Sequence, residues 1–444
     1  MIERIVIVND LSHAMGGASL LAVQAAKSLA RRGCPVTFIC GSTGSEDLES
    51  QGIEVIALGQ ERLLAANPAT TIVRGIYNRQ AADMVHRWIA RHDTPRTVYH
   101  IHGWSQILSP SLFRALAPVH KRTLVHAHDF FATCPNGAMF DYRKSAPCPA
   151  TPMSASCIAT ACDRRGRASK IWRTARQAMQ DHILRGERLP LLLIHGGMRP
   201  FFARSGYRPG DMAVLPNPVM PFTDDRVAAE CNSEVLFVGR MEATKGIDLA
   251  AQACRRAGVK LLAAGTGELL DGLRTAFPEM TWVGRKPHSE IAPLARRARI
   301  AVMPSRHIEP FGLAAVEALW SGIPVLSSNT SLIAPDIETA GAGRSIDPRD
   351  IGGFAAAIAA IARDDALTRR MSENAYAQTN GLALTPEGWI DALLAAYEGY
   401  LRDGKRGLAA AAGSWAGNPV REAVSHIAST PAIAPRPMAQ NGVY

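Results

Sequence analysis

The stretch EPFGLAAVEAL, at positions 309–319, places two acids around a turn that leads into an apolar helix. Pro310 and Gly312 shape the turn, so the first amides of the predicted helix stay free and, with the helix dipole, attract an anion. Glu309 would lie in the loop, where its carboxylate can accept hydrogen bonds from sugar hydroxyls. Glu317 lies inside the helix, where it can accept from both hydroxyls of a ribose. The stretch therefore indicates a site that binds a phosphate, a sugar and a ribose.

The segment FVGRMEATKG, 237–246, provides cations for the same purpose. A strand is expected to end at Gly239, and Arg240 and Lys245 follow in the turn before a helix. Two cations at the end of a strand can hold a diphosphate, Arg as a planar fork and Lys as a point charge. A solvated turn could contain the same residues, so this segment indicates a diphosphate site only in combination with the other motifs. Three further glycines stand in turns whose amides can approach a phosphate: Gly16, Gly17 and Gly265.

These residues stand among strands that alternate with helices. Such alternation predicts parallel sheets flanked by helices, and two such runs predict two doubly wound domains. A ligand is then expected where the carboxyl ends of the strands face a crevice. The expected strands are 5–10, 35–40, 97–103 and 123–129 in the first half, and 234–240, 259–265, 280–284, 300–305 and 323–328 in the second.

The bulk composition fits a protein of this kind. The chain has 444 residues, of which 47% are hydrophobic and 20% charged, and this length suggests two or three domains. The net charge of +10 favours an anionic partner such as a nucleotide or a phospholipid surface. No basic motif with interleaved aromatics is apparent, so nucleic acid is not expected. The start MIERIVIVND is typical of a strand rather than a signal peptide, and no run is long enough to span a membrane, so we expect a cytoplasmic protein.

EPFGLAAVEAL resembles the E-x7-E signature of retaining glycosyltransferases with the GT-B fold, in particular glycosyltransferase family 4, also called glycosyl transferase group 1. The resemblance extends over nearly all of 1–404. It includes the early Gly-Gly turn, VLPNP (214–218), AGTGE (264–268), WVGRKPHSEI (282–291) and a helix around Trp389. It implies an α/β protein of the GT-B class, in which two doubly wound Rossmann-like domains face a central cleft.

The resemblance, with a break in regular structure near 209–217, divides the chain. We expect an acceptor-side domain at 1–208 and a nucleotide-sugar-binding domain at 209–384. The segment 385–404 would be a helix that crosses back to the first domain. From 405 to 444 the chain is rich in Ala, Gly, Pro and Ser without sustained periodicity, which predicts a disordered tail.

In the family that the chain resembles, the nucleotide sugar lies mainly on the second domain. Carried over, Arg240 and Lys245 are ligands of the diphosphate, and Glu309 is a ligand of the sugar. Glu317 binds the ribose, and the early Gly-Gly turn closes over the phosphates. The expected donor site is Gly16, Gly17, Gly239, Arg240, Lys245, Gly265, Glu309, Phe311, Gly312, Leu313 and Glu317.

His128, in VHAHDF, resembles the family's active-site histidine beside the anomeric carbon. It stands at the end of a predicted strand before a loop, which favours a functional role over a strand cap. His102 and Asp129 are weaker candidates on the acceptor side, and His126 is expected to face the other side of the sheet and to be structural. The expected catalytic set is His128, Arg240, Lys245 and Glu309.

The implied reaction moves a hexosyl or similar group from a UDP- or GDP-sugar to a hydroxyl of a glycan or a lipid-linked acceptor, with retention at the anomeric carbon. It would serve polysaccharide or glycoconjugate biosynthesis. In the family the leaving diphosphate helps to deprotonate the acceptor, so neither a protein nucleophile nor a cofactor is required. The chain has no Asp-x-Asp motif, and we expect no catalytic metal.

Two other functions stay open at this point. A nucleotide-sugar epimerase of similar two-domain build would need additional acid and base carboxylates in the cleft. A non-catalytic subunit that binds sugar nucleotides would have no need of all four charged donor residues.

An insertion with little regular pattern, 134–162, follows His128 on the expected acceptor side, where it would shape the choice of acceptor. It contains Cys134, Cys148, Cys157 and Cys162. Four thiolates can hold zinc in a tetrahedron and staple a loop that lacks a core. Their spacing is not a paired C-x2-C, and free or redox-labile thiols in a reducing compartment are the alternative.

The segment 163–188 contains eight Arg or Lys against three acids. Apolar residues recur in it at helical spacing: Ile171, Trp172, Ala175, Met179 and Ile183. Lys170, Arg173 and Arg176 are expected to point away from this apolar face. Such a helix can lie peripherally on an anionic membrane, here the inner face of the plasma membrane. The alternative is a solvated surface helix that covers its own core.

Overall fold

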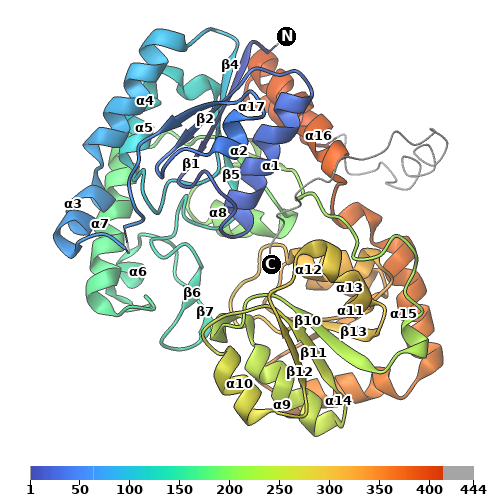
Figure 1. Ribbon diagram of the computed structural model, residues 1–444. Helices are drawn as coiled ribbons and strands as arrows, with labels where there is room; N and C mark the ends of the chain where they lie inside the picture. The colour runs from blue at the N-terminus through green and yellow to red at the C-terminus, as the bar shows by residue number, and fades with distance from the viewer. Residues whose placement is uncertain (1, 64, 414–444) are drawn as a thin grey trace. The chain divides into compact units, whose positions relative to one another are not determined.

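The computed structural model describes residues 2–63 and 65–413, which form two compact units (Figure 1). The first unit extends to Leu215 and resumes at Ile390, and the second comprises Pro216–Trp389. Each unit is a parallel β-sheet with helices packed on it, as the alternating sequence pattern predicts.

Within the described residues the sheet of the first unit has seven parallel strands, in the order β3-β2-β1-β4-β5-β8-β9. Its register pairs Ile5 with Val36 on one side and with Val98 on the other. The inner strands β2, β4 and β5 are buried along their whole length, which explains why their sequences are nearly continuous apolar runs. The strands are β1 (Arg4–Asn9), β2 (Val36–Cys40), β3 (Glu54–Ala57), β4 (Thr97–Ile101), β5 (Thr123–Ala127), β8 (Leu191–Leu193) and β9 (Met212–Val214).

Local signals define where the helices begin. Helix α1 follows Gly16, whose φ of 105° suits a residue without a Cβ. Helix α4 is capped by Asn78, whose side chain accepts from the amide of Ala81. The helices of this part of the chain are α1 (Gly17–Arg31), α2 (Glu46–Glu49), α3 (Pro68–Ile76), α4 (Arg79–His92), α5 (Ser111–Ala115), α6 (Ala155–Ala159), α7 (Arg167–Leu184) and α8 (Arg199–Ala203).

The described sheet of the second unit has six parallel strands, in the order β12-β11-β10-β13-β14-β15. The strands are β10 (Glu234–Val238), β11 (Leu261–Ala264), β12 (Thr281–Gly284), β13 (Ala298–Met303), β14 (Val325–Ser328) and β15 (Gly343–Ile346). The helices are α9 (Ile247–Ala257), α10 (Leu270–Ala276), α11 (Ala292–Ala295), α12 (Leu313–Trp320), α13 (Ala334–Thr339), α14 (Ile351–Ala362) and α15 (Asp365–Gln378). Val235, Ile300 and Phe354 belong to one buried apolar cluster that joins the sheet to α9 and α14. The strand order reverses between β10 and β13, so the carboxyl ends of these two strands flank the position where doubly wound sheets bind ligands.

The end of the described chain packs on the first unit. Helix α16 (Pro386–Asp403) belongs to it from Ile390 onward, and the hydroxyl of its Tyr400 donates to the carbonyl of Thr123. Helix α17 (Lys405–Gly413) follows, and its Lys405 donates to the carbonyl of Arg188. The predicted disordered tail is therefore wrong for 405–413, where an alanine run favours a helix that buries Leu408. The rest of that predicted tail, 414–444, lies outside the described residues.

Helix α7 buries several polar side chains and exposes one of its isoleucines. Lys170 and Arg176 are buried, with 2% and 6% of their surface exposed, whereas Ile171 is 63% exposed. The inward polar side chains have polar partners, since Trp104 donates through Nε1 to Gln180 at 2.8 Å. Arg176 in turn donates to the carbonyl of Trp104. Lys170 and Arg176 are therefore buried because the surface that this helix covers is itself polar.

The insertion 134–162 contains little regular structure. Its strands β6 (Phe140–Asp141) and β7 (Ala146–Pro147) form a short antiparallel pair, and α6 follows them. Across the described ranges, no helix combines the length and the apolar composition that a membrane span requires.

Candidate active site

Three turns at the carboxyl ends of β10, β11 and β13 pack without intervening side chains. A Cβ on Gly265 would lie 1.8 Å from the carbonyl oxygen of Gly239, and one on Gly246 would lie 1.9 Å from that of Pro304. The amide of Met241 donates to the carbonyl of Thr266 at 2.9 Å. Only glycine permits this approach, so the turn that carries Arg240 and Lys245 is held against its neighbours.

Lys245 and Glu309 meet at this edge of the sheet. Nζ of Lys245 lies 2.5 Å from Oε2 of Glu309, and the hydroxyl of Ser305 donates to the same oxygen at 3.2 Å. Nε2 of His307 lies 3.8 Å from it. The lysine follows β10 and the glutamate follows β13, so this contact joins the two strands at which the sheet order reverses.

The surroundings of Glu309 keep it ionised. Burial alone would raise the pKa of this carboxyl, but the charge of Lys245 and the nearby His307, with hydrogen bonds from Lys245 and Ser305, lower the pKa to about 2. A carboxylate with such a low pKa is a good hydrogen-bond acceptor and a poor proton acceptor. The site can therefore bind hydroxyl groups through Glu309 without removing their protons.

Two residues that were not predicted as site residues, Arg306 and Thr330, stabilise the loop of Glu309. Arg306 forms a bidentate pair with Asp248 at 2.7 and 2.6 Å, and it also donates to the carbonyl of Ala243 in the turn of Lys245. The hydroxyl of Thr330 donates to the carbonyls of Ser305 and His307. Arg306 and His307 stand directly before the Glu309 motif, but nothing in their spacing indicates these partners.

Helix α12 begins at the same edge. Gly312 precedes it with a φ of 81°, and a Cβ there would lie 2.3 Å from Sδ of Met303, so the tight turn requires glycine. No side chain caps the helix, and its first amides are available near Glu309 and Leu313. Phe311 is 2% exposed and packs inward, so at this predicted donor position only the backbone can contact a ligand.

Glu317 lies one turn further along α12, four residues after Leu313 and on the same helical face. Its side chain is 7% exposed, and Oε1 lies 3.8 Å from Nε2 of His288. His288 also hydrogen-bonds the carbonyl of Met220 at 3.2 Å, and burial lowers its pKa. The glutamate is therefore held in place at a largely covered position of the helix.

Arg240 differs from the other donor candidates because it is exposed. Its guanidinium donates to Glu242 at 2.6 Å, and 60% of its side chain is open to solvent. A surface ion pair of this kind contributes little to stability, so the guanidinium is free to turn toward an anionic ligand.

In the first unit, His102 and His128 form a hydrogen-bonded pair. Nδ1 of His102 lies 2.9 Å from Nε2 of His128. His102 follows β4, which flanks the reversal point between β1 and β4, and His128 follows the neighbouring strand β5. Burial lowers the pKa of His128 to about 3, so its ring is neutral at physiological pH. The contact occupies one ring nitrogen of His128 and leaves the other for a ligand.

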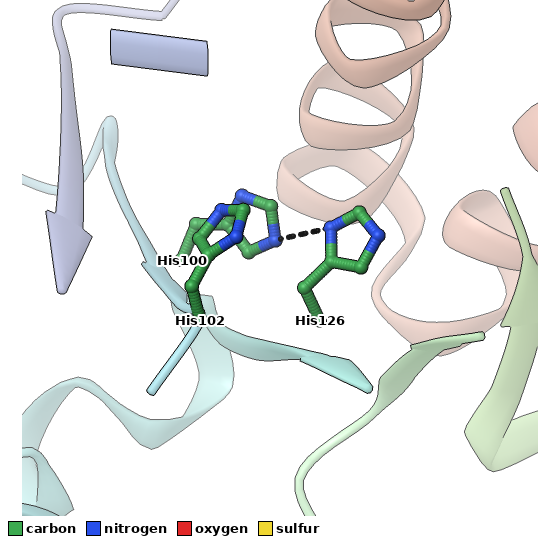
Figure 2. A group of neighbouring side chains, drawn as sticks. All are labelled: His100, His102 and His126. Atoms are coloured by element: carbon green, nitrogen blue, oxygen red, sulfur yellow. Dashed lines mark hydrogen bonds between the residues drawn. The ribbon is translucent and has the colours of Figure 1, made fainter. Parts of the chain in front are cut away.

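Two further histidines, His100 and His126, pack against this pair. Figure 2 shows the rings of His100, on β4, and of His102, directly after that strand, beside that of His126, on β5. Nε2 of His100 lies 3.2 Å from Nδ1 of His126, and Nδ1 of His100 lies 2.7 Å from the hydroxyl of Tyr397. Among the described residues, these three histidines are the one group of three or more metal-type ligands whose ligand atoms all lie within 4.8 Å. Their rings stack, with centroids 4.2 to 5.2 Å apart, rather than converging on one point.

The prediction that His126 faces away from His128 is wrong. The two rings stack 4.4 Å apart at an angle of 4°. Residues two apart on a strand point to the same face, so the strand period itself places them together.

Two carboxyl groups, those of Asp10 and Asp129, follow the carboxyl ends of β1 and β5. Burial raises the pKa of Asp129 to about 6. The hydrogen bond from the amide of Phe131 and the charge of Arg176 lower this pKa and offset part of the effect of burial. Asp10, at the end of β1, accepts from the amides of Gln106, Ile107 and Leu108, and burial raises its pKa. Asp10 was not among the predicted site residues, although it stands at the end of a predicted strand, and Arg176 was not expected to face it.

The turn glycines Gly16 and Gly17 lie at the exposed start of α1, on the first unit. A Cβ at either position would meet nothing within 4 Å. Packing therefore does not require glycine there, and its role as a phosphate contact stays a prediction.

All eight cysteines are free thiols. In the insertion, Cys134 and Cys162 both contact the side chain of Asn136, at 3.1 and 3.5 Å. Lys170 donates to Sγ of Cys157 at 3.4 Å. The sulfurs do not lie close enough together to form a tetrahedral site in this structure, and zinc binding by the four stays a prediction.

Solved structures show the class of fold. Sucrose-phosphate synthase from Thermosynechococcus elongatus superposes with a TM-score of 0.65 and 18% identity, covering 89% of this chain and 98% of that one. WaaG, a glycosyltransferase involved in lipopolysaccharide biosynthesis, gives a TM-score of 0.59 and 16% identity over 87% and 98%. The Anabaena HepE complex with UDP-glucose gives 0.58 and 15% over 88% and 98%. The chain has the GT-B fold of these glycosyltransferases.

Sequence comparison gives a more specific result for the second unit. Residues 224–378 match the family model Glycosyl transferases group 1. Glycogen synthase from Mycobacterium tuberculosis (strain ATCC 25618 / H37Rv) is 36% identical over 154 residues, which are 32% of this chain and 37% of that protein. The match thus spans little more than a third of that relative. D-inositol 3-phosphate glycosyltransferase from Mycobacterium bovis (strain BCG / Pasteur 1173P2) is 27% identical over 401 residues, 86% of this chain and 78% of that protein.

Proposed function

We propose that the protein is a retaining glycosyltransferase of family 4 that moves a hexosyl group from a nucleotide sugar to a hydroxyl of a glycan or a lipid-linked acceptor. The observation that carries this proposal is the Lys245–Glu309 contact at the reversal point of the second sheet, beside the uncapped start of α12. Cations, a fixed acceptor and free amides stand there within one short stretch of structure.

The roles follow from the chemistry of each group. Lys245 and Arg240 neutralise the diphosphate, and the amides at Gly312 and Leu313 add hydrogen bonds to the charge that develops as it leaves. Glu309 accepts from sugar hydroxyls, and Glu317 from the ribose. Gly16 and Gly17 contribute amides from the first unit. The donor is a UDP- or GDP-sugar, a proposal supported by the HepE structures that hold UDP and UDP-glucose.

The titration behaviour of the site supports a leaving group that serves as its own base. Glu309, with a pKa of about 2, and His128, with a pKa of about 3, are both weak proton acceptors at neutral pH. A departing phosphate oxygen is a better base than either. It would take the proton of the acceptor hydroxyl as the new bond forms on the same face of the sugar. His128 then donates or accepts a hydrogen bond as a neutral ring.

The acceptor side belongs to the first unit, with His102 and Asp129 near His128. The insertion 134–162 begins five residues after Asp129 and is proposed to shape acceptor choice. The free cysteines support a reducing compartment such as the cytoplasm. We place the reaction in polysaccharide or glycoconjugate biosynthesis.

A panel of UDP-, GDP- and ADP-sugars tests the proposal. Purified protein is incubated with each donor and candidate acceptors, nucleotide release is measured, and products are identified by mass spectrometry. The anomeric configuration of the product is read by NMR. We expect transfer, or slow donor hydrolysis, with one nucleotide class and an α-linked product from an α-linked donor.

Matched variants make the test specific. Lys245→Ala and Arg240→Ala should abolish or strongly reduce turnover, while Lys260→Ala and Arg344→Ala, exposed cations elsewhere in the second unit, should not. Formation of an epimerised nucleotide sugar would identify an epimerase instead. Donor binding without turnover, with every donor and acceptor tested, would identify a non-catalytic subunit.

A further inference from the structure

Exposed apolar side chains gather on one part of the first unit. Of the six large hydrophobic residues that stand out as exposed in the described chain, four lie on α3, α6 and α7: Ile72 (56%), Val73 (68%), Ile158 (51%) and Ile171 (63%). Single exposed apolar residues are ordinary, but four on adjoining elements call for a partner.

Two contacts join these elements next to the exposed positions. Nε1 of Trp172 donates to the carbonyl of Ile72 at 3.1 Å, and a Cβ on Gly75 would collide with the Trp172 ring at 2.1 Å. Helix α3 is therefore packed tightly on α7, and Figure 1 shows them side by side. Lys170 donates to Cys157, the neighbour of Ile158, which ties α6 to the same end of α7. We call the surface formed by Ile72, Val73, Ile158 and Ile171 the isoleucine patch.

The charge around the isoleucine patch has one sign. From 142 to 180 the sequence has eight Arg or Lys and one acid, Asp163. That acid is buried and paired with Arg173 at 2.7 Å, so it does not offset the surface cations. From 62 to 82 there are three arginines and no acid. Arg143, Lys144, Arg164, Arg165 and Arg167 are exposed.

Helix α7 contributes Ile171 to the patch because its polar residues face inward. The helix buries Lys170, Arg176, Gln177 and Gln180 and leaves Ile171 in solvent. The inward side chains have polar partners, whereas Ile171 exposes apolar surface to water. An exposed isoleucine gains stability when its outer face meets an apolar phase.

We propose that the isoleucine patch and its arginines form a docking surface for a lipid bilayer with anionic headgroups. The isoleucines and Val73 would enter the boundary between headgroups and acyl chains, and the arginines would lie at the phosphate level. Apolar insertion and charge attraction are both needed, because either alone gives weak and reversible binding. This surface would hold the first unit where a lipid-linked acceptor is available. The inference goes beyond the transfer reaction and does not depend on it.

Vesicle co-sedimentation of the full chain tests the docking surface. Vesicles of phosphatidylcholine alone are compared with vesicles of phosphatidylcholine and phosphatidylglycerol, at low and at physiological salt, without any donor. We expect binding to the anionic vesicles that weakens as salt screens the arginines. We expect little binding to phosphatidylcholine alone.

Two variants separate the contributions. Ile72→Ser with Ile171→Ser should lower the partition coefficient about tenfold, and Arg165→Gln with Arg167→Gln should do the same at low salt. Met220→Ser, an exposed apolar residue of the second unit, and Arg344→Gln are the controls and should bind as the parent does. All substituted side chains are exposed, so the fold should be kept, and thermal unfolding checks this.

Equal binding to neutral and anionic vesicles, or unchanged binding by both double variants, would overturn the proposal. Absence of vesicle binding by the parent would do so too and would point to an acidic protein as the partner. Donor turnover is measured in a separate assay with soluble acceptors. A negative result in the vesicle experiment therefore does not contradict the proposed transferase activity, which that assay tests on its own.

Discussion

Nζ of Lys245 lies 2.5 Å from Oε2 of Glu309, across the point where the strand order of the second sheet reverses. One residue follows β10 and the other follows β13, so their contact depends on the sheet topology and not on sequence proximity. A largely covered pair of this kind contributes modestly to stability when complete, but removal of one partner leaves a costly charge. The pair is better explained as a preformed site for a ligand that is anionic at one end and rich in hydroxyls at the other.

The first prediction concerns Lys245. Lys245→Ala removes the point charge that faces the diphosphate, so the affinity for the nucleotide diphosphate should fall 10- to 100-fold, about 1.5 to 3 kcal/mol. Isothermal titration calorimetry with the diphosphate of the active donor measures this. Lys260→Ala provides the matched control. An affinity within threefold of the parent would remove Lys245 from the phosphate site.

The second prediction concerns the pH dependence of the same variant. In the parent the pKa of Glu309 is about 2, because Lys245 and its neighbours outweigh burial. Without the ammonium, burial dominates and the pKa of Glu309 rises, so the carboxyl becomes protonated as the pH falls toward mildly acidic values. Residual turnover by Lys245→Ala should therefore show an acid limb that the parent lacks between pH 5 and 8. Parallel pH profiles for parent and variant would contradict this coupling.

Glu309→Gln should separate sugar binding from phosphate binding. The amide keeps one acceptor oxygen but loses the charge, and Lys245 remains to hold the phosphates. We expect the affinity for the free nucleotide diphosphate to stay within about threefold, while kcat with the nucleotide sugar falls at least 100-fold, about 3 kcal/mol. Calorimetry and initial-rate kinetics together make the distinction. Equal losses in both assays would show that Glu309 acts by structuring the loop rather than by contacting the sugar.

The hydrogen bond between His102 and His128 predicts a positioning effect. It engages Nε2 of His128 and thereby selects which nitrogen of the neutral ring faces the ligand. His102→Phe should lower kcat about tenfold with little change in the KM of the donor, and His102→Gln, which keeps a polar group near the ring, should restore part of the loss. Since the pKa of His128 is about 3, no limb from its protonation is expected above pH 5. A change confined to KM would show that His102 contacts the donor instead.

The turns around Lys245 and Glu309 were largely predictable from sequence because their determinants are local. Gly312 is needed for a turn with positive φ, the apolar run after it makes a helix, and the glycines beside Arg240 allow close packing of strand ends. Each of these features acts within a few residues. The bracing of the loop by Arg306 and Asp248 was not predictable, since the two lie on different elements and neither stands in a distinctive spacing.

Helix α7 shows where pattern analysis fails. Periodicity locates an apolar stripe, but it assumes that the surface beneath the helix is apolar. Here the covered surface contains Asp10, Asp129 and the thiol of Cys157, so Arg176 and Lys170 turn inward. The identity of that surface is set by strand ends and a loop distant in sequence, and no window of the helix itself contains the information.

The last prediction concerns Asp129 and the stability of the first unit. Burial raises the pKa of this carboxyl to about 6 from an ordinary 3.8, so the folded chain binds the proton more tightly than the unfolded chain does. Ionisation of Asp129 therefore costs folded-state stability as the pH rises from about 4 through 6, and the cost is absent below about 4. Asn at this position keeps an oxygen that accepts from the amide of Phe131, as Asp129 does at 2.9 Å.

Asp129→Asn should therefore raise the apparent free energy of unfolding by about 1 to 2 kcal/mol at pH 8 and leave it unchanged at pH 4. Urea denaturation of parent and variant at both pH values measures the difference. Hydrogen exchange of the folded proteins then shows whether the gain lies in the first unit. The charge of Arg176 lowers the pKa of Asp129 and so reduces the cost of its ionisation. In an Arg176→Gln background, Asp129→Asn should therefore raise the free energy of unfolding at pH 8 by more than it does in the parent. A variant that is less stable than the parent at pH 8 would show that the ionised carboxylate is held favourably by Arg176 and that burial does not dominate its titration.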